Sequence, residues 1–410
     1  MTHTFTSVRQ IVEDGYCVSC GLCSAVSDGR AAMGWTAAGN YRPNTGALSH
    51  DEETQILALC PGINVTGPFD TKTPALDPVW GEIRDVSMGW ATDPETRHRS
   101  SAGGVMTAIN RYLLETDQVD FVLQVAAATD DALHSEPVMV RNPADLLTGS
   151  QSRYAPVAPL KVIRDALTLG ERFSVSLKPC DIAGVRNLQR VDPRARDLIV
   201  YTQTMFCGTT PARSETEAFF DRRNVDASAL DHMQWRGDGC PGATKGTLPD
   251  GTVVDGPYTE LWTGKWQTQF RCKICPDAIG LQADLATGDI WAGGMPTGET
   301  PGENAIITHT DIGQRIYQGA VDAGYLHVTP LSMDAVSDSQ PHHVALRRTF
   351  GTRVAATTAA GHAAPNFTGL NEPALTATLT QTERQTTFDG TRDRVAKGQA
   401  DECVDFDGFD

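Results

Sequence analysis

Three cysteines near the N-terminus, Cys17, Cys20 and Cys23, are spaced three residues apart in the stretch GYCVSCGLCSAV. A C-x2-C-x2-C loop can wrap one face of a [4Fe–4S] cubane, because each pair of intervening residues brings the next sulfur to a different iron. Such loops take a fourth ligand from a remote cysteine followed by proline, and Cys60-Pro61 supplies one. The pattern therefore predicts a [4Fe–4S] site. Zinc, which normally pairs its ligands two and two, and free thiols are the less favoured alternatives.

A second set of thiols comes later in the chain and consists of Cys180, Cys207, Cys272 and Cys275. The first two end the strand-like runs RFSVSLKPC and DLIVYTQTMFC, and FRCKICPD adds a C-x2-C pair. Open α/β sheets place their sites at the ends of strands, so these three segments can meet and close a second cluster. Zinc and buried structural cysteines remain alternatives here. Cys240 and Cys403 are left over. Cys240 precedes a proline but has no C-x2-C partner nearby.

Composition limits the classes of protein to consider. The chain has 410 residues, ten cysteines and a formal net charge of −17. This acidic balance makes nucleic acid a poor partner. The sequence contains no run of 18 apolar residues and no N-terminal secretion signal, so we expect no membrane span and a cytoplasmic location. Ten thiols in such a chain indicate metal or redox chemistry rather than disulfides.

Alternating strand-like and helix-like segments predict an α/β fold with a mixed, mostly parallel sheet. A glycine turn in SSAGGVMTAINRYLLET opens a helix with one apolar face, and β-like runs precede Cys180 and Cys207. The expected organisation is a small ferredoxin-like cysteine-rich segment (1–65), a Pro-rich linker (66–79), two halves of the α/β domain (80–170 and 171–365) and a disordered acidic tail (366–410).

Six strings in fixed order carry a family resemblance: SSAGGVMTAI, GSQSRYAPV, KPCDIAGVRNLQ, MFCG, CKICPDAIGLQADLATGDIW and NAIITHTDIGQRIYQGAVDAG. Over about residues 80–345 the chain resembles the coenzyme F420 hydrogenase/dehydrogenase beta-subunit family. The additional CVSCGLC…CP motif resembles the two-cluster FAD reductases of that family, such as 7-hydroxymethyl chlorophyll a reductase and the ferredoxin-dependent 8-vinyl reductase.

The resemblance implies that FAD lies beside a [4Fe–4S] cluster held by the second cysteine set. It places the flavin near Ser101, Gly103, Gly104, Val105, Arg153, Tyr154 and Lys178. In SSAGGV the glycines would let a helix N-terminus approach a diphosphate, although a glycine turn alone is more often a packing feature. Arg153 would face a phosphate and Tyr154 a ring, the alternatives being a surface salt bridge and a core aromatic. Lys178 would balance the negative charge of the cluster or of the flavin. Ala102 departs from the usual SGG pattern of the family.

These features together predict an oxidoreductase that accepts single electrons from a ferredoxin-type donor. The electrons would pass through two [4Fe–4S] clusters to FAD, for two-electron reduction of an organic substrate. The first alternative is a subunit of a larger complex that oxidises reduced F420 or NAD(P)H, and the second is a non-redox protein stapled by zinc. A homo-oligomer is compatible with either redox function. No catalytic residue is identified, since His98, His309, His342 and His343 qualify by residue type only.

Overall fold

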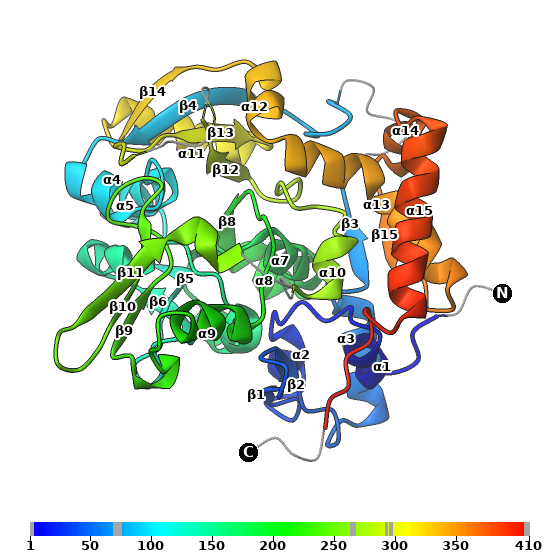
Figure 1. The fold of residues 1–410 in the computed structure, drawn as a ribbon. Coiled ribbons are helices and arrows are strands. Elements are labelled where there is room, and N and C mark those ends of the chain that lie inside the picture. Colours follow the sequence, from blue (N-terminus) through cyan, green and yellow to red (C-terminus); the bar gives the residue numbers. More distant parts are fainter. Residues whose placement is uncertain (1–3, 69–75, 263–267, 292–293, 295–297, 406–410) are drawn as a thin grey trace.

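A central eight-stranded sheet organises the molecule (Figure 1). The computed structural model describes residues 4–68, 76–262, 268–291, 294 and 298–405. In spatial order the strands are β14 (Leu326–Pro330), β4 (Asp85–Ala91), β13 (Asn304–Thr308), β12 (Leu285–Asp289), β8 (Ile199–Met205), β7 (Phe173–Ser176), β5 (Phe121–Ala127) and β6 (Ser135–Val140).

The sheet is mixed, but the expectation that it is mostly parallel is wrong. Neighbours β12, β8, β7 and β5 run parallel to one another. The pairs β5–β6, β12–β13, β13–β4 and β4–β14 are antiparallel. Helical crossovers such as α7 (Pro179–Val191) and α8 (Pro193–Leu198), between β7 and β8, generate the parallel centre. At both margins of the sheet, neighbouring strands are antiparallel. The sequence pattern of a strand does not reveal beside which other strand it will pair.

Helices cover both faces of the sheet. On one face α5 (Val105–Glu115) and α11 (Asp311–Asp322) pack their apolar residues on Val122, Tyr201 and Ile306. On the other face α6 (Ile163–Thr168) and α7 pack on Phe121, Leu123 and the residues of β7. Successive residues of β5 thus enter opposite cores, as the two-residue repeat of a strand requires. Both faces are closed, and the strand ends remain as the place for a site.

The N-terminal unit lies against the second of these faces. It comprises α1 (Val8–Glu13), α2 (Leu22–Val26), the antiparallel pair β1 (Met33–Trp35) and β2 (Tyr41–Pro43), α3 (His50–Leu59) and β3 (Asn64–Thr66). Ser49 and Glu52 form a capping box that starts α3, which ends directly before Cys60. Leu22 and Ala25 of α2 join the core beneath α6 and α7, so this unit is built into the main domain. The expected linker at 66–79 lies partly outside the described residues, which omit 69–75.

A smaller antiparallel sheet stands beside the main one. It contains β9 (His232–Gln234), β10 (Ala243–Thr247) and β11 (Val253–Pro257), and α9 (Arg213–Asp221) packs on it through Phe219 and Phe220. The remaining short elements are α4 (Pro94–Arg99), α10 (Phe270–Lys273) and four 3₁₀ segments at Pro143–Gly149, Pro159–Val162, Ala227–Ala229 and Tyr258–Trp262.

The expectation of a disordered tail from residue 366 is wrong up to residue 405. The chain continues from α12 (Met333–Ser339) and α13 (Pro341–Ala359) into β15 (Asn366–Thr368), α14 (Glu372–Ala377) and α15 (Gln381–Ala396). Strand β15 pairs in parallel with β3, and α15 packs along α13 (Figure 1). Several large apolar residues of this segment, among them Leu370, Leu375 and Val395, are buried. A low apolar content is sufficient because Leu370 and Leu375 join the core that contains Trp80 and Phe350, and Val395 joins the core that contains Tyr16 and Phe270. Residues 406–410 lie outside the described part.

Within the described residues, no helix is both long enough and apolar enough to cross a membrane.

Candidate functional site

The structure brings the four thiols of the first set together. Burial raises the pKa of Cys23, and the neighbouring Cys17 and Cys60 raise it further. Burial likewise raises the pKa of Cys20, with contributions from Cys60 and Cys23. All four cysteines line one cavity together with apolar residues such as Val12, Leu22 and Leu59. Mutual repulsion of four buried thiolates means that a strongly positive centre is required to ionise them together.

Glycines allow the chain to pass close to this set. Gly21 has φ +77° and precedes α2, and a Cβ there would lie 2.8 Å from the Cβ of Ala158. A Cβ on Gly62 would lie 2.4 Å from the Tyr16 carbonyl oxygen and 3.3 Å from the Cys60 sulfur. These positions exclude side chains because the loop backbone itself packs there.

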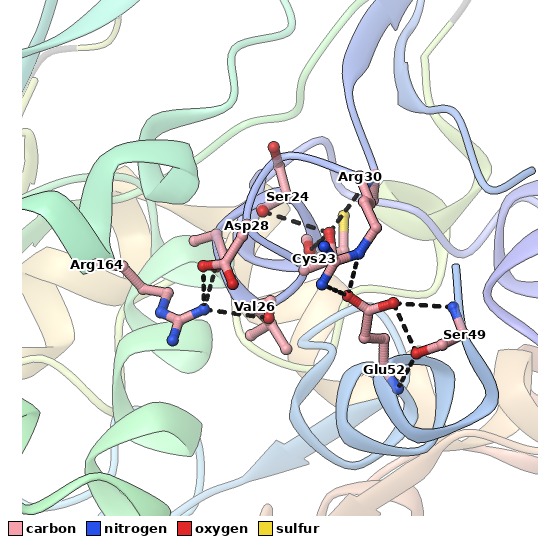
Figure 2. A network of polar contacts seen from close by, with 11 residues as sticks. Cys23, Ser24, Val26, Asp28, Arg30, Ser49, Glu52 and Arg164 are labelled. Carbon is pink, nitrogen blue, oxygen red and sulfur yellow. Dashed lines mark hydrogen bonds and ion pairs between the residues drawn. The ribbon is translucent and has the colours of Figure 1, made fainter. Parts of the chain in front are cut away.

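A polar network fixes the outer side of the cysteine loop (Figure 2). The Ser27 hydroxyl donates to the Cys23 carbonyl oxygen at 2.8 Å, which ties down the end of α2. Arg164 of α6 donates to the Val26 carbonyl at 3.4 Å and pairs with Asp28 at 2.5 Å. Hydrogen bonds therefore attach the first set to the body of the α/β domain.

The second set is also brought together, at the end of the parallel strands. Cys180 lies in the first turn of α7 after β7, Cys207 follows β8, and Cys272 lies in α10. Burial raises the pKa of Cys207, and Cys272 and Cys275 add to the shift. The pKa of Cys180 is raised by burial, with contributions from Cys207 and Cys272. Both sets predicted from spacing are thus spatial clusters, and their role as metal ligands stays a prediction.

Cys240 and Cys403 belong to neither cluster. Cys240 is buried beside Asp289 and Arg236, and its amide pairs with the Thr300 carbonyl. Cys403 is exposed. Among the described residues, no three cysteine, histidine or carboxylate side chains are arranged to hold one metal ion. The donor chemistry of each cluster, four thiols without carboxylates, fits a [4Fe–4S] centre, in which each sulfur binds a different iron.

Lys178 lies between the two clusters. Its ammonium nitrogen is 2.7 Å from both carboxylate oxygens of Asp181. Burial raises the pKa of Asp181 to about 6, and Lys178 counteracts that rise. The thiols of Cys20 and Cys180, one from each set, both act on the Lys178 ammonium. Lys178 was predicted to balance the charge of a cluster or of the flavin, and the structure places it near thiols of both sets; its role stays a prediction.

Arg271 is a second residue that connects the two thiol sets, and it was not identified from the sequence. It is buried, and its Nε donates to the Gly62 carbonyl at 2.7 Å, two residues after Cys60. Its own backbone precedes Cys272, and its guanidinium acts on both Cys60 and Cys275. The only sequence signal was its place beside a predicted ligand.

Three of the seven predicted flavin contacts, Ser101, Gly103 and Gly104, lie in the loop at residues 100–104, and a fourth, Val105, begins α5. Gly104 has φ +76° and is the N-cap of α5. A Cβ on Gly103 would lie 2.7 Å from the Gly89 carbonyl oxygen, so this glycine serves packing against β4. Val105 is fully buried in the core, which leaves only its backbone to face a ligand. The Ser101 hydroxyl accepts from the Ser152 amide at 2.8 Å, which joins this loop to the GSQSRYAPV segment.

Arg153 is half-buried, and its guanidinium lies 5.8 Å from the ring centre of Trp235. The Arg153 Nε and one terminal nitrogen have no hydrogen-bond partner among the described residues, and burial lowers the pKa of Arg153 to about 10. The surface salt bridge considered for it is therefore absent from the described residues. A guanidinium with buried, unused donors fits an anionic ligand such as a phosphate. Tyr154, in contrast, packs edge-on against Trp262 at 4.9 Å, close to the core-aromatic alternative.

Arg236 holds this region together and was not singled out from the sequence. It is buried, donates to the Ser101 carbonyl at 2.7 Å and pairs with Asp289 at 2.9 Å at the end of β12. Its guanidinium also lies 4.7 Å from the ring centre of Tyr258. The interaction partners of Arg236 come from three distant segments, so no local sequence motif could identify this residue.

Two of the histidines named by type are buried. His309 is 2.6 Å from the Glu82 carbonyl oxygen through Nδ1, a structural contact. Burial, helped by His342, lowers the pKa of His343 to about 4. Its ring lies 5.9 Å from that of Phe206, the residue before Cys207.

Comparison with known proteins places these features in a family. Residues 86–164 match the model of the coenzyme F420 hydrogenase/dehydrogenase beta subunit N-terminal region, and residues 170–334 match that of its C-terminal region. The chain is 24% identical over 265 residues to the coenzyme F420 hydrogenase subunit beta of Methanosarcina barkeri, which covers 62% of this chain and 84% of that subunit.

Two further comparisons agree. The coenzyme F420-dependent sulfite reductase of Methanocaldococcus jannaschii is 24% identical over 336 residues, covering 75% of this chain, and the chain spans only 46% of that protein's length. A chain in the structure of the F420-reducing [NiFe] hydrogenase complex from Methanosarcina barkeri has a TM-score of 0.51 at 22% identity, covering 68% of this chain and 97% of that chain. This protein belongs to the coenzyme F420 hydrogenase/dehydrogenase beta-subunit family.

Proposed function

We propose that this protein is an iron–sulfur flavoprotein that transfers electrons between a one-electron protein partner and a two-electron organic cofactor or substrate. The observation that carries the proposal is the pair of four-thiol clusters, with the Lys178 ammonium interacting with thiols of both. Zinc staples would not need such a junction, whereas redox centres that exchange electrons must lie close together.

The chain's residues have distinct parts in this proposal. The two thiol clusters would hold two [4Fe–4S] centres, and Arg153 with the loop at residues 100–104 would bind the FAD phosphates. When bound, these groups supply one-electron and two-electron redox chemistry. Lys178 and Arg271 supply positive charge next to the thiolates, and the apolar residues around the first cluster exclude water.

Coenzyme F420 is the first candidate for the two-electron partner. Two similar proteins are named as a coenzyme F420-dependent sulfite reductase and a coenzyme F420 hydrogenase subunit. We infer that the present chain is a subunit of such a redox complex. A ferredoxin-type donor with an organic substrate is the second candidate. It is favoured by the N-terminal cysteine unit, residues 1–65, which lies outside both family matches.

Anaerobic purification followed by metal, sulfide and flavin analysis tests the proposal. We expect about eight iron atoms and one FAD per chain. A colourless protein with zinc and no iron would contradict it and favour the zinc alternative. The loaded protein is then mixed with reduced F420, NADPH or reduced ferredoxin. Bleaching of the flavin by reduced F420 supports the first candidate, and bleaching only by ferredoxin supports the second.

A further inference from the structure

The segment after α15 returns to the N-terminal unit and runs along its cysteine loop. The Glu402 amide donates to the Glu13 carbonyl at 2.8 Å. Gly15 has φ +73°, and a Cβ there would lie 2.1 Å from the Ala400 carbonyl oxygen, so the two backbones are in direct contact. His362, beyond α13, is 3.1 Å from Asp401. Residues 398–405, which we call the return segment, are therefore held at several points.

Glu402 of the return segment pairs with a completely buried arginine. The side chain of Arg42, in β2, has no exposed surface, and its Nε donates to Glu402 at 2.7 Å. A second guanidinium nitrogen contacts the other carboxylate oxygen. The remaining terminal nitrogen donates to the Ser19 hydroxyl at 2.7 Å and to the Tyr41 carbonyl at 3.3 Å. Every guanidinium nitrogen of Arg42 thus has a partner, and two of the three nitrogens depend on Glu402 for it.

Arg42 also faces both thiol clusters. Its charge acts on Cys17 of the first set, and it is itself influenced by Cys17 and by Cys272 of the second set. Ser19, between Cys17 and Cys20, has the unusual φ of +62°. Its hydroxyl lies 3.5 Å from the Gln269 amide nitrogen, three residues before Cys272. The Arg42 guanidinium therefore lies where the cysteine-bearing segments of both sets meet.

We propose that Arg42 and Glu402 are a positioning pair. Through it the return segment holds the Cys17–Cys20 loop against the Cys272 segment and sets the charge felt by the two clusters. This inference rests on the proposed function, because it concerns iron–sulfur centres bound by these thiols. Both residues lie outside residues 86–164 and 170–334, which the family models match.

Charge compensation gives the pair a measurable signature. Without the Glu402 carboxylate, Arg42 is an uncompensated buried cation beside thiolates. Such a cation stabilises the reduced form of a nearby cluster, which carries one more negative charge, and so shifts its reduction potential upward. Removing both charges restores the balance.

The test compares Glu402→Gln with Asp389→Asn, a partly exposed carboxylate of α15 that pairs with Arg392 on the same helix. Iron analysis of the unsubstituted protein first tests the proposed function on its own. Potentials of both clusters are then titrated anaerobically by electron paramagnetic resonance. We expect an upward shift of at least one potential in Glu402→Gln, none in Asp389→Asn, and a return toward the original value when Arg42→Met and Glu402→Leu are combined.

Amide exchange in residues 398–405 should accelerate at least about tenfold in Glu402→Gln only.

Unchanged potentials and unchanged exchange in a fully loaded Glu402→Gln protein would overturn the inference. Where Glu402→Gln fails to retain iron, the double variant decides. Retention of about eight iron atoms by that variant supports charge compensation, and loss of iron from it as well overturns the role assigned to the pair.

Discussion

Both carboxylate oxygens of Asp181 lie 2.7 Å from the Lys178 ammonium, and thiols of both four-cysteine sets act on this ammonium. Lys178 directly precedes α7, and Asp181 lies in the first turn of that helix. Because the two residues are only three positions apart, the sequence itself provides the lysine after β7 with its carboxylate partner. Burial alone would lower the pKa of the lysine, but Asp181 and the surrounding thiols raise it, so it stays charged at neutral pH.

Lys178→Met is predicted to destabilise the protein by about 3 kcal/mol, because it leaves the Asp181 carboxylate buried without its partner. The free energy of unfolding is measured with urea at pH 7.5. Lys397→Met, at an exposed lysine, serves as the control and should change it by less than about 0.5 kcal/mol. Equal effects of the two substitutions would show that the Lys178–Asp181 pair contributes nothing beyond a surface charge.

Cys272→Ser is predicted to lower the iron content by about four atoms per chain, because it removes one ligand of the second cluster. Cys240→Ser removes a buried thiol that belongs to neither cluster, and this variant should retain about eight iron atoms. Iron and sulfide are measured after anaerobic purification. Loss of iron in Cys240→Ser with full retention in Cys272→Ser would mean that Cys240 is the ligand.

Arg153→Met is predicted to weaken FAD binding by about 10-fold or more, because a charge-assisted hydrogen bond to a phosphate contributes roughly 1.5–3 kcal/mol. The flavin-free protein should not be destabilised, since the described residues offer the Arg153 Nε no hydrogen-bond partner to lose. Flavin titration gives the affinity and urea unfolding gives the stability. Arg141→Met, at an exposed arginine paired with Glu171, is the control. Unchanged FAD affinity together with a large loss of stability would assign Arg153 a purely structural role.

His343 is predicted to make the protein less stable as the pH falls. Its folded-state pKa of about 4 lies below the usual 6.5, so the folded state resists protonation. The stability contribution is fully present above pH 6.5 and is lost as the pH falls toward 4. The slope is at most about 1.4 kcal/mol per pH unit, or about 2 kcal/mol between pH 7 and pH 5.

The measurement is the difference in urea unfolding free energy between the unsubstituted protein and His343→Leu, from pH 7.5 to pH 5. We expect this difference to change with pH, whereas His232→Asn, at an exposed position, should run parallel to the unsubstituted protein. A pH-independent difference for His343→Leu would show that the ring is not held neutral.

Local spacing was enough to group the thiols. The C-x2-C-x2-C loop with Cys60-Pro61, and the thiols that follow β7 and β8, were predicted as two sets and lie together as two sets. The direction of the outer strands was not predictable, because a strand's hydrophobic pattern is the same beside a parallel or an antiparallel neighbour. The order of residues 366–405 was also missed, since a polar segment folds when existing cores accept its few apolar residues.

The sequence by itself determined the thiol sets, the α/β class and the family, because these depend on residue types at short and fixed intervals. Only the tertiary structure decided which partners the buried cations take. Arg42 meets Glu402, 360 residues away, and Arg236 joins Ser101 to Asp289. Buried cations take their partners from whichever segments the fold brings near. Their burial and pairing are therefore properties of the packed chain and leave no periodic trace in the sequence.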